Sequence, residues 1–247
     1  MSQLIIFILE KSHGLITWAK QNKLNAVIVG MLSLFFLQYL ILPNNSLQSL
    51  RKNNPKKTAM MVQREDEASS SDKNFNIQQQ WVPISRISKN LINAVIVSED
   101  GMFYEHEGVD WYEVEESIIK NLEKGKAARG GSTISQQLSK NLYLSTSKDP
   151  VRKLKELIIT LRMERTLSKR RILEIYLNVI EWGNGVFGAE AAAKKYFGKS
   201  ASQLSREEAA QMASVIPSPR KYQPNIMSRY VARRSSIILN RMSARGM

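Results

Sequence analysis

Beyond Val82, nearly every interpretable stretch of this 247-residue sequence repeats its apolar residues at the spacing of a helix. Helix starts can be recognised as well. Asp149 precedes Pro150, which is an N-cap followed by a proline in the first turn. Ser205 and Glu208 have the spacing of a capping box. Alternating apolar and polar runs between hairpin turns are not recognisable here. The sequence therefore predicts an all-α fold for this part of the chain.

Apolar stripes mark the faces on which these helices are expected to pack. Asp110 and Glu113 have the spacing of a cap, and their helix is expected to end at Gly125. Ser168 can cap a helix that runs through Asn178. The stripes expected on three of the helices are Trp111, Val114, Ile118 and Leu122; Val151, Leu154, Ile158 and Leu161; and Val231, Ile238 and Met242.

The segment from Leu24 to Leu42 carries no charge and is about as long as the roughly 20 apolar residues with which a helix crosses a bilayer. A cleaved signal peptide and a buried core helix are the alternatives, but the run is long for a signal peptide and no small-residue cleavage site follows it. We expect a transmembrane helix over residues 24–42 after a short cytoplasmic segment, residues 1–23. Basic residues flank the run on both sides, so they do not fix its orientation.

Residues 43–80 are rich in Asn, Ser, Gln and charged side chains, and they include a low-complexity stretch from Glu65 to Asp72. Such a segment buries too little surface to offset its ordering entropy, so we expect a flexible linker there. The folded domain is then expected over residues 81–247. Most of the excess positive charge of the chain also lies in this last part.

The composition limits the chemistry that this chain can perform. It has no cysteine, which excludes disulfides, thiolate nucleophiles and cysteine zinc sites, and its two histidines are His13 and His106. Carboxylates and cations must therefore carry any reaction. A formal net charge of +14 favours an anionic partner, and charge alone does not choose among nucleic acid, acidic lipid headgroups and a phosphorylated substrate.

The first candidate site is Glu99 with Asp100, which follow the apolar run 91–97 at the edge of a core. Desolvation can raise the pKa of a carboxyl group in such a place, as a general acid or base requires. Acidic residues at a helix end are, however, more often solvated, and local evidence alone favours that interpretation. His106 has no second histidine at ligand spacing and is expected to be a hydrogen-bonded structural residue.

The second candidate site is a glycine loop at residues 130–131 that leads into a helix start at Ser132 or Thr133. Gln136 can complete a capping box with Thr133. Exposed N–H groups and the helix dipole favour an anion at such a start, and Lys140 lies two turns further along. An ordinary glycine loop before a helix explains the same residues equally well.

The third candidate site lies on the helix that begins at Pro150. Arg152 and Glu156 are four residues apart and can pair. Lys153 and Lys155 place two more cations near a helix N-terminus, whose dipole does not favour them. This mismatch suggests an anionic ligand, and a solvated basic face is the alternative.

Together these stretches resemble the signature blocks of the peptidoglycan glycosyltransferase family, glycosyltransferase family 51. The block E-D-x-x-F-x-x-H-x-G-x-D is matched from Glu99 to Asp110. The block G-G-S-T-[IL]-[ST]-Q-Q, with a following Lys and Asn, is matched from Gly130 to Asn141. R-K-x-x-E is matched from Arg152 to Glu156, and I-L-E-x-Y-L-N from Ile172 to Asn178. Further on, WGNGVFGAEAAAKKYFGK and PSPRKYQP, which ends at Pro224, also resemble the family. Because the sequence ends soon after this last stretch, we expect a monofunctional member of the family.

The resemblance implies a lysozyme-like α-helical domain that polymerises lipid II into β-1,4-linked glycan with inversion and releases undecaprenyl pyrophosphate. It implies that Glu99 is the catalytic base. It also implies that Glu156 positions cations, or holds a divalent ion, Mg²⁺ or Mn²⁺, against the pyrophosphate; no organic cofactor is expected. The residues that it implies in substrate binding are Ser132, Thr133, Gln136, Gln137, Lys140, Asn141, Lys148, Arg152 and Lys155, with Lys148 standing where the family often has arginine.

The resemblance further implies partners and a location. The partners are lipid II, the lipid-linked growing strand, the membrane, and other proteins of cell-wall synthesis and division, but no nucleic acid. The catalytic domain is expected outside the cytoplasmic membrane, the inner membrane of the cell. Two rival functions stay open. A lysozyme-type hydrolase also uses paired carboxylates but has no need of the cations beside Glu156. A tethered nucleic-acid-binding protein fits the charge, but the sequence has no recognisable binding module.

Overall fold

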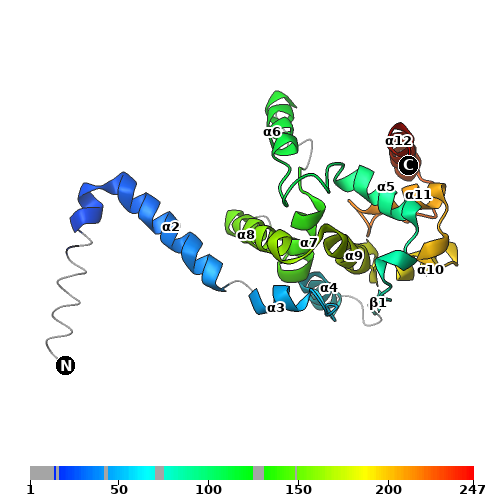
Figure 1. The fold of residues 1–247 in the computed structure, drawn as a ribbon, viewed down its shortest axis with the longest axis horizontal. Coiled ribbons are helices and arrows are strands. Elements are labelled where there is room, and N and C mark those ends of the chain that lie inside the picture. Colours follow the sequence, from blue (N-terminus) through cyan, green and yellow to red (C-terminus); the bar gives the residue numbers. More distant parts are fainter. Residues whose placement is uncertain (1–13, 15–16, 42–43, 70–74, 125–130, 148) are drawn as a thin grey trace. The chain divides into compact units, whose positions relative to one another are not determined.

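The computed structural model describes residue 14 and residues 17–41, 44–69, 75–124, 131–147 and 149–247. The chain divides into two units, residues 1–43 and 44–247, and each is described by itself. The first unit contains helix α2 (Lys23–Ile41). The helices of the second unit (Figure 1) are α3 (Asn44–Ser49), α4 (Ala59–Ser69), α5 (Lys89–Glu99), α6 (Trp111–Lys124), α7 (Ile134–Tyr143), α8 (Pro150–Thr166), α9 (Lys169–Val179), α10 (Ala189–Phe197), α11 (Arg206–Val215), α12 (Arg229–Ala244) and the 3-10 helices η1 (Ile84–Arg86) and η2 (Ala201–Gln203).

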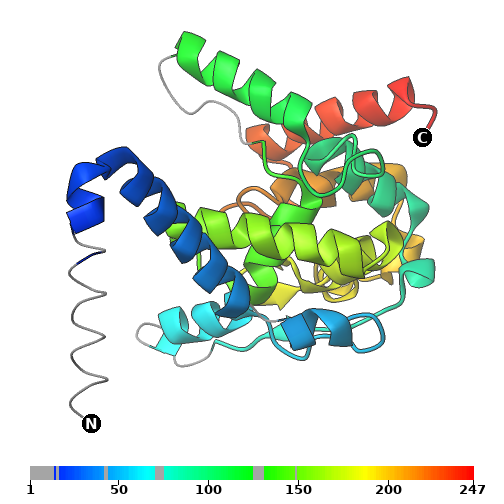
Figure 2. The ribbon, with the colours of Figure 1, turned by 60° about the vertical axis from the view of Figure 1, so that its left-hand side comes forward.

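Helix α7 lies at the centre of the second unit, where it packs against α8, α9 and α4. Its side chains Ile134 and Leu138 are completely buried, and they share this core with Ile159 of α8 and Ile172 of α9. Helices α11 and α12 pack against each other and against α5. Figures 1 and 2 show α6 projecting away from these packed helices. The predicted helical class is therefore confirmed, and the core surrounds α7.

The helix starts expected from the sequence are confirmed by their capping hydrogen bonds. The carboxylate of Asp149 accepts a hydrogen bond from the backbone N–H of Arg152 at 2.7 Å. Ser168 caps α9, and Ser205 caps α11 in a complete capping box. Asp110 accepts from the backbone N–H three residues later at the start of α6. These bonds satisfy N–H groups that the first turn of a helix otherwise leaves without a partner.

The unit also contains a small sheet that the all-α prediction missed. It consists, in the order β1-β3-β2, of β1 (Gln78–Gln79), β2 (Glu181–Gly183) and β3 (Val186–Phe187). Strand β3 pairs with β2 in antiparallel and with β1 in parallel orientation. The strands have two or three residues, and β2 and β3 are buried throughout, so no polar alternation marks them. The usable sequence signal was the Asn-Gly pair at residues 184–185, which is typical of hairpin turns, with a φ of 70° at Gly185.

The expected flexible linker over residues 43–80 is wrong for most of that range. Helices α3 and α4 lie in it, and Leu47, Leu50, Met60 and Met61 are buried. The guanidinium of Arg171 on α9 also donates hydrogen bonds to the backbone of this segment. A few well-spaced apolar residues are thus enough to fix a segment of polar composition, because the domain supplies the rest of the core.

Two of the expected packing faces also differ from the structure. On α8, Ile158 is buried as expected, but Val151 and Leu161 are exposed. The buried face of α8 carries the polar residues Glu156 and Thr160 beside Ile158, Ile159 and Met163, and a search for apolar stripes passes over the polar ones. On α6, the side chain of Trp111 is 70% exposed because this helix projects from the core. The face predicted for α12 is confirmed.

Helix α2 covers the expected transmembrane segment except Leu42, which lies outside the described residues. The helix carries no charge after Lys23, and its apolar side chains Val27, Met31 and Phe36 are exposed. Among the residues that the structure describes, no helix has both the length and the apolar character that a bilayer crossing requires. The membrane anchor stays a prediction.

Candidate active site

The carboxylate of Glu99 is held at the C-terminal end of α5. Ser88 caps the start of this helix, and the N–H of Asp100 closes its last turn on the carbonyl of Ile96. The apolar residues between them are buried against α11 and α12. Because the helix ends at the edge of this core, the Glu99 side chain is only 9% exposed. The predicted position at a core edge is confirmed, and the solvated alternative is wrong.

Three neighbours contact the Glu99 carboxylate. Its Oε2 accepts a hydrogen bond from Gln137 Nε2 at 3.1 Å, and its Oε1 accepts one from Ser98 Oγ at 3.0 Å. The guanidinium of Arg234 on α12 lies 3.8 Å from Oε1. The phenol of Tyr176 donates to Gln137 Oε1 at 2.9 Å, which orients the amide so that its NH₂ group faces Glu99.

These surroundings raise the pKa of the Glu99 carboxyl above its ordinary value. Burial is the main cause, because desolvation penalises the charged form. The hydrogen bonds from Gln137 and Ser98 and the charge of Arg234 act in the opposite direction and offset part of the rise. A carboxylate with a raised pKa is a stronger base, so this site suits proton abstraction near neutral pH.

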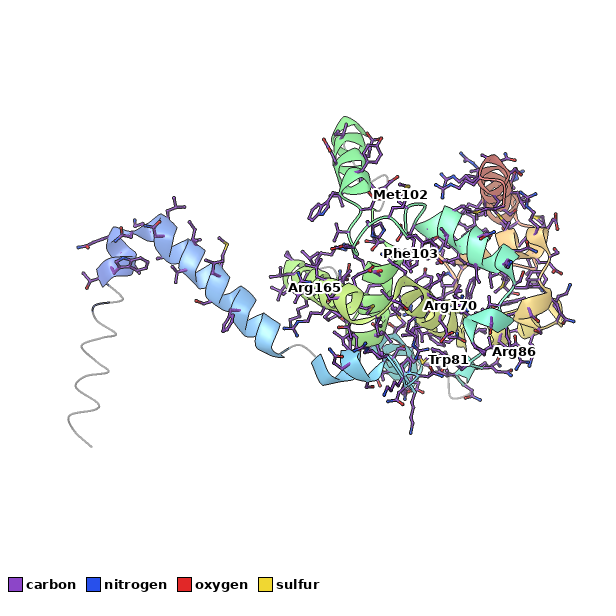
Figure 3. All side chains as sticks on the ribbon, in the orientation of Figure 1. Trp81, Arg86, Met102, Phe103, Arg165 and Arg170 are labelled. Atoms are coloured by element: carbon purple, nitrogen blue, oxygen red, sulfur yellow. The ribbon has the colours of Figure 1, made fainter. Side chains whose placement is uncertain are left out.

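Asp100 and His106 brace the loop that follows Glu99. The Nδ1 of His106 accepts a hydrogen bond from the N–H of Gly108 at 3.0 Å, which places the ring proton on Nε2. That nitrogen donates to Asp100 at 3.0 Å. In Figure 3 this loop carries Met102 and Phe103, and the Phe103 ring is buried. The expectation that His106 is a hydrogen-bonded residue is confirmed.

The predicted anion site at the start of α7 is occupied by a carboxylate of the protein itself. Asp100 Oδ2 accepts the N–H of Ile134 at 2.9 Å. Thr133 and Gln136 form the predicted capping box, and both side chains are buried. Thr133 also donates to the carbonyl of Gly108 at 2.7 Å. The structure therefore places Thr133 and Gln136 in the framework of the site, and substrate contact by either one stays a prediction.

The second carboxylate, Glu156, lies in a group of cations on the buried face of α8. Arg152 Nη1 pairs with Glu156 Oε2 at 2.6 Å, as the four-residue spacing predicted. Lys153 Nζ pairs with the other oxygen of the same carboxylate. The Glu156 side chain is 4% exposed, whereas that of Lys153 is 49% exposed. One buried anion thus holds two cations, and Lys153 remains accessible to solvent.

Lys140 of α7 belongs to the same group of charges. Its pKa is lowered, mainly because the ammonium is partly buried, and the positive charges of Arg152, Lys153 and Arg64 add to this effect. The negative charge of Glu156 acts in the opposite direction. A cation that is partly desolvated among other cations gains from a bound anion, so we call Lys140, Arg152 and Lys153 with Glu156 the anion site.

Helix α7 connects the Glu99 carboxylate to the anion site. Gln137 reaches Glu99, and Lys140 lies three residues further along the same helix. Asn141 donates to the carbonyl of Gln137 at 2.8 Å, and Ser132 accepts from Lys153 Nζ at 3.3 Å. Of the other predicted residues, Lys155 is half-buried on α8 and Lys148 lies outside the described residues.

The surroundings of Glu156 do not fit a divalent metal ion. Mg²⁺ and Mn²⁺ prefer several oxygen ligands, but both Glu156 oxygens are paired with cations and Lys140 lies nearby. Within the described ranges, no group of three or more acidic, histidine or cysteine side chains could hold a metal. The metal role of Glu156 stays a prediction that these contacts do not favour.

The sequence-based prediction missed Arg234, Ser98 and Tyr176 as neighbours of Glu99. A usable signal existed for Arg234. It follows Val231 by three residues and precedes Ile238 by four, so it lies at the edge of the buried face of α12. Arg64 was missed because its helix was expected to be a linker. Ser98 directly precedes Glu99, so its contact could have been expected from the sequence. Tyr176 offers no local signal, since only the packing of α9 against α7 brings its phenol to Gln137.

The fold and the site define a helical enzyme domain that can move a proton at one carboxylate and bind an anion beside a second. Comparison with known proteins agrees with this class. The family model described as Transglycosylase matches residues 65–243. The biosynthetic peptidoglycan transglycosylase of Nitrosospira multiformis is 50% identical over 191 residues, covering 77% of this chain and 83% of the relative. The biosynthetic peptidoglycan transglycosylase of Chromobacterium violaceum is 47% identical over 216 residues, covering 87% of this chain and 95% of the relative. The chain therefore belongs to the transglycosylase family.

Proposed function

We propose that this protein is a peptidoglycan glycosyltransferase that polymerises lipid II in cell-wall synthesis. One observation carries the proposal: the two buried carboxylates have opposite surroundings. Glu99 is desolvated and has a raised pKa, whereas Glu156 is paired with cations that can receive a pyrophosphate. The family and the names of the relatives support the same activity.

In the proposed reaction Glu99 acts as the base. The carboxylate takes the proton of the 4-hydroxyl group of the acceptor sugar while the oxygen attacks C1 of the donor. The bond from C1 to the pyrophosphate oxygen breaks on the opposite face, which inverts the configuration and gives a β-1,4 linkage. The proton ends on Glu99 and the electron pair on undecaprenyl pyrophosphate.

The anion site is proposed to neutralise the leaving pyrophosphate. Lys140 and Arg152 supply positive charge where negative charge develops, and Lys155, Lys148 and Ser132 are proposed to add further contacts. Glu156 pairs with Arg152 and Lys153, holds them in place and serves as their counterion. A hydrolase that releases a neutral sugar hydroxyl would have no use for this cluster.

One assay separates the proposed polymerase from the hydrolase. The full chain in detergent is incubated with lipid II and, in parallel, with finished glycan strands. We expect lipid II to be converted to long strands and the finished strands to remain intact. Shortening of the strands without consumption of lipid II would contradict the proposal and favour the hydrolase. Salt-sensitive binding of duplex DNA without glycan synthesis would favour the nucleic-acid-binding alternative.

The charge of Arg234 is expected to set the lower pH limit of activity. It favours the ionised form of Glu99, so Arg234→Gln raises the pKa of Glu99 further. Because the base must be ionised, the acidic limb of the profile of kcat/KM against pH should move to higher pH. Arg229→Gln, which changes an exposed arginine of the same helix, is the control and should leave the limb unchanged. If the acidic limb of Arg234→Gln does not move, the charge of Arg234 does not influence the ionisation of the catalytic base.

We also propose that α2 anchors the protein in the cytoplasmic membrane with the catalytic domain outside. The support is the uncharged stretch after Lys23 and the exposed apolar side chains of the helix. In spheroplasts, external protease should degrade the catalytic domain, and an alkaline wash should leave the intact chain with the membranes. Recovery of the chain in the soluble fraction would contradict the anchor. Recruitment of other cell-wall synthesis and division proteins stays a prediction.

A further inference from the structure

Helix α4, which precedes the predicted domain, is fixed to the catalytic core by ion pairs. Arg64 Nε contacts Glu181 of β2 at 2.9 Å, and Arg64 Nη1 contacts Glu67 at 2.9 Å. Glu67 pairs in turn with Arg220 at 3.0 Å. The side chains of Arg64 and Glu181 are 14% and 5% exposed. Buried pairing of this kind holds α4 in one orientation, since moving the helix would leave a carboxylate buried without its cation.

The residue before Arg64 reaches from α4 to the loop in front of the anion site. Gln63 Nε2 donates to Thr146 Oγ1 at 2.7 Å, and Gln63 Oε1 accepts the backbone N–H of Thr146 at 3.1 Å. The two bonds run in opposite directions, so they fix both the amide and the backbone of Thr146. Gln63 Nε2 also donates to Glu67 at 2.7 Å, which links the amide to the ion pairs of Arg64.

The bonded loop residue lies next to a direct partner of the anion site. The carbonyl of Ser147 accepts a hydrogen bond from Arg152 Nε. Arg152 Nη1 then pairs with Glu156. A continuous path therefore runs from Gln63 through hydrogen bonds to Thr146, along the chain to Ser147, and from the Ser147 carbonyl to Arg152.

We propose that Gln63 is a positioning residue of the anion site, which orients Arg152 through the loop at Thr146. The inference rests on the proposed function, because it assigns Arg152 to the leaving pyrophosphate. Arg152 can neutralise that charge only if its guanidinium faces the substrate, and the Ser147 carbonyl fixes one edge of the guanidinium. Helix α4 thereby belongs to the catalytic machinery, although Gln63 does not touch the reacting atoms.

The test compares Gln63→Met, which removes the two hydrogen bonds to Thr146 and the one to Glu67 and keeps the length of the side chain, with the wild-type chain in detergent. We expect kcat/KM for lipid II to fall about tenfold, as when other supporting contacts of a site are removed. The loss should lie mainly in kcat, because charge on the leaving group develops in the transition state. A purely structural role would lower the melting temperature without this division between kcat and KM.

Two further variants complete the design. Gln48→Met makes the same change at an exposed position of α3 and should keep the wild-type kcat and KM. Thr146→Val removes the hydroxyl that accepts from Gln63 Nε2 but keeps the backbone N–H that donates to Gln63 Oε1, so its loss should be the smaller one. The double variant with Gln63→Met should be no slower than Gln63→Met alone, because both changes act through the same contact. If Gln63→Met unfolds, the fall caused by Thr146→Val decides the matter.

The outcomes that overturn the inference differ from those that overturn the proposed function. If Gln63→Met and Thr146→Val both keep the wild-type kcat/KM, Gln63 is not a positioning residue. The same follows if the losses of the two single variants multiply in the double variant. In either case, polymerisation of lipid II by the wild-type chain would still support the proposed function. Failure of the wild-type chain to polymerise lipid II would contradict both the proposed function and the role of Gln63.

Discussion

Glu99→Gln is expected to fold and to polymerise lipid II about 10²- to 10⁴-fold more slowly than the wild-type chain, the range typical of a lost general base. The amide has nearly the shape of the carboxylate but cannot take the proton of the acceptor hydroxyl. Initial rates of strand formation from lipid II, with saturating substrate, measure the effect.

Thermal unfolding distinguishes this chemical loss from damage to the fold. Burial raises the pKa of Glu99, so the free energy of unfolding falls as pH rises through that pKa and the buried group ionises. The amide avoids this loss, and at neutral pH the melting temperature of Glu99→Gln should equal or exceed that of the wild-type chain. Glu107→Gln, an exposed glutamate on the following loop, is the matched control for activity. Near-normal polymerisation by Glu99→Gln would exclude Glu99 as the base.

The second large effect is expected for Glu156→Gln, which leaves the cations of the anion site without their counterion. We expect the rate of polymerisation to fall about 10²-fold, because Arg152 and Lys153 lose the group that orients them. The free energy of unfolding should fall by about 1–3 kcal/mol, the usual effect of losing hydrogen bonds between charged groups.

The pH profile gives a sharper test of Glu156. Its negative charge opposes the lowering of the Lys140 pKa, so Glu156→Gln should lower that pKa further. Lys140 binds an anion only below its pKa, when it is charged, and the alkaline limb of kcat/KM should therefore move to lower pH. Glu105→Gln, an exposed glutamate, should leave the limb in place. An unmoved alkaline limb together with full activity would restrict Glu156 to a structural role.

How much of the fold the sequence predicts depends on how local each determinant is. The caps at Asp149, Ser168 and Ser205 involve residues only a few positions apart, and all three were predicted correctly. The sheet joins β1 to β3 across about a hundred residues of sequence, and its strands are too short for a period to show. The docking of α4 also depends on a distant residue, Glu181, so the composition of that segment suggested a linker.

The site follows the same rule. The pairing of Arg152 with Glu156 is set by one helical turn and was predicted, whereas local evidence assigned Glu99 to solvent. Only the ordered motif matches indicated its role, and its burial comes from α11 and α12, which lie far along the chain. Arg234 could have been found from helical spacing. The hydrogen bond from the Ile134 N–H at the start of α7 to Asp100 could not have been predicted, because the residues between them include a loop without regular spacing.

The helical geometry of α7 has a consequence for which changes the chain can tolerate. Gln137 and Lys140 are three residues apart, so their positions differ by about 4.5 Å along the helix axis and by a fixed rotation. One inserted or deleted residue between them would turn every later side chain by about 100° and carry Lys140 away from Glu156. Glu99 with Gln137, which serve proton transfer, and the anion site would then no longer face the same substrate, although no functional residue had been replaced. The number of residues between Gln137 and Lys140 is therefore fixed by the geometry of the site.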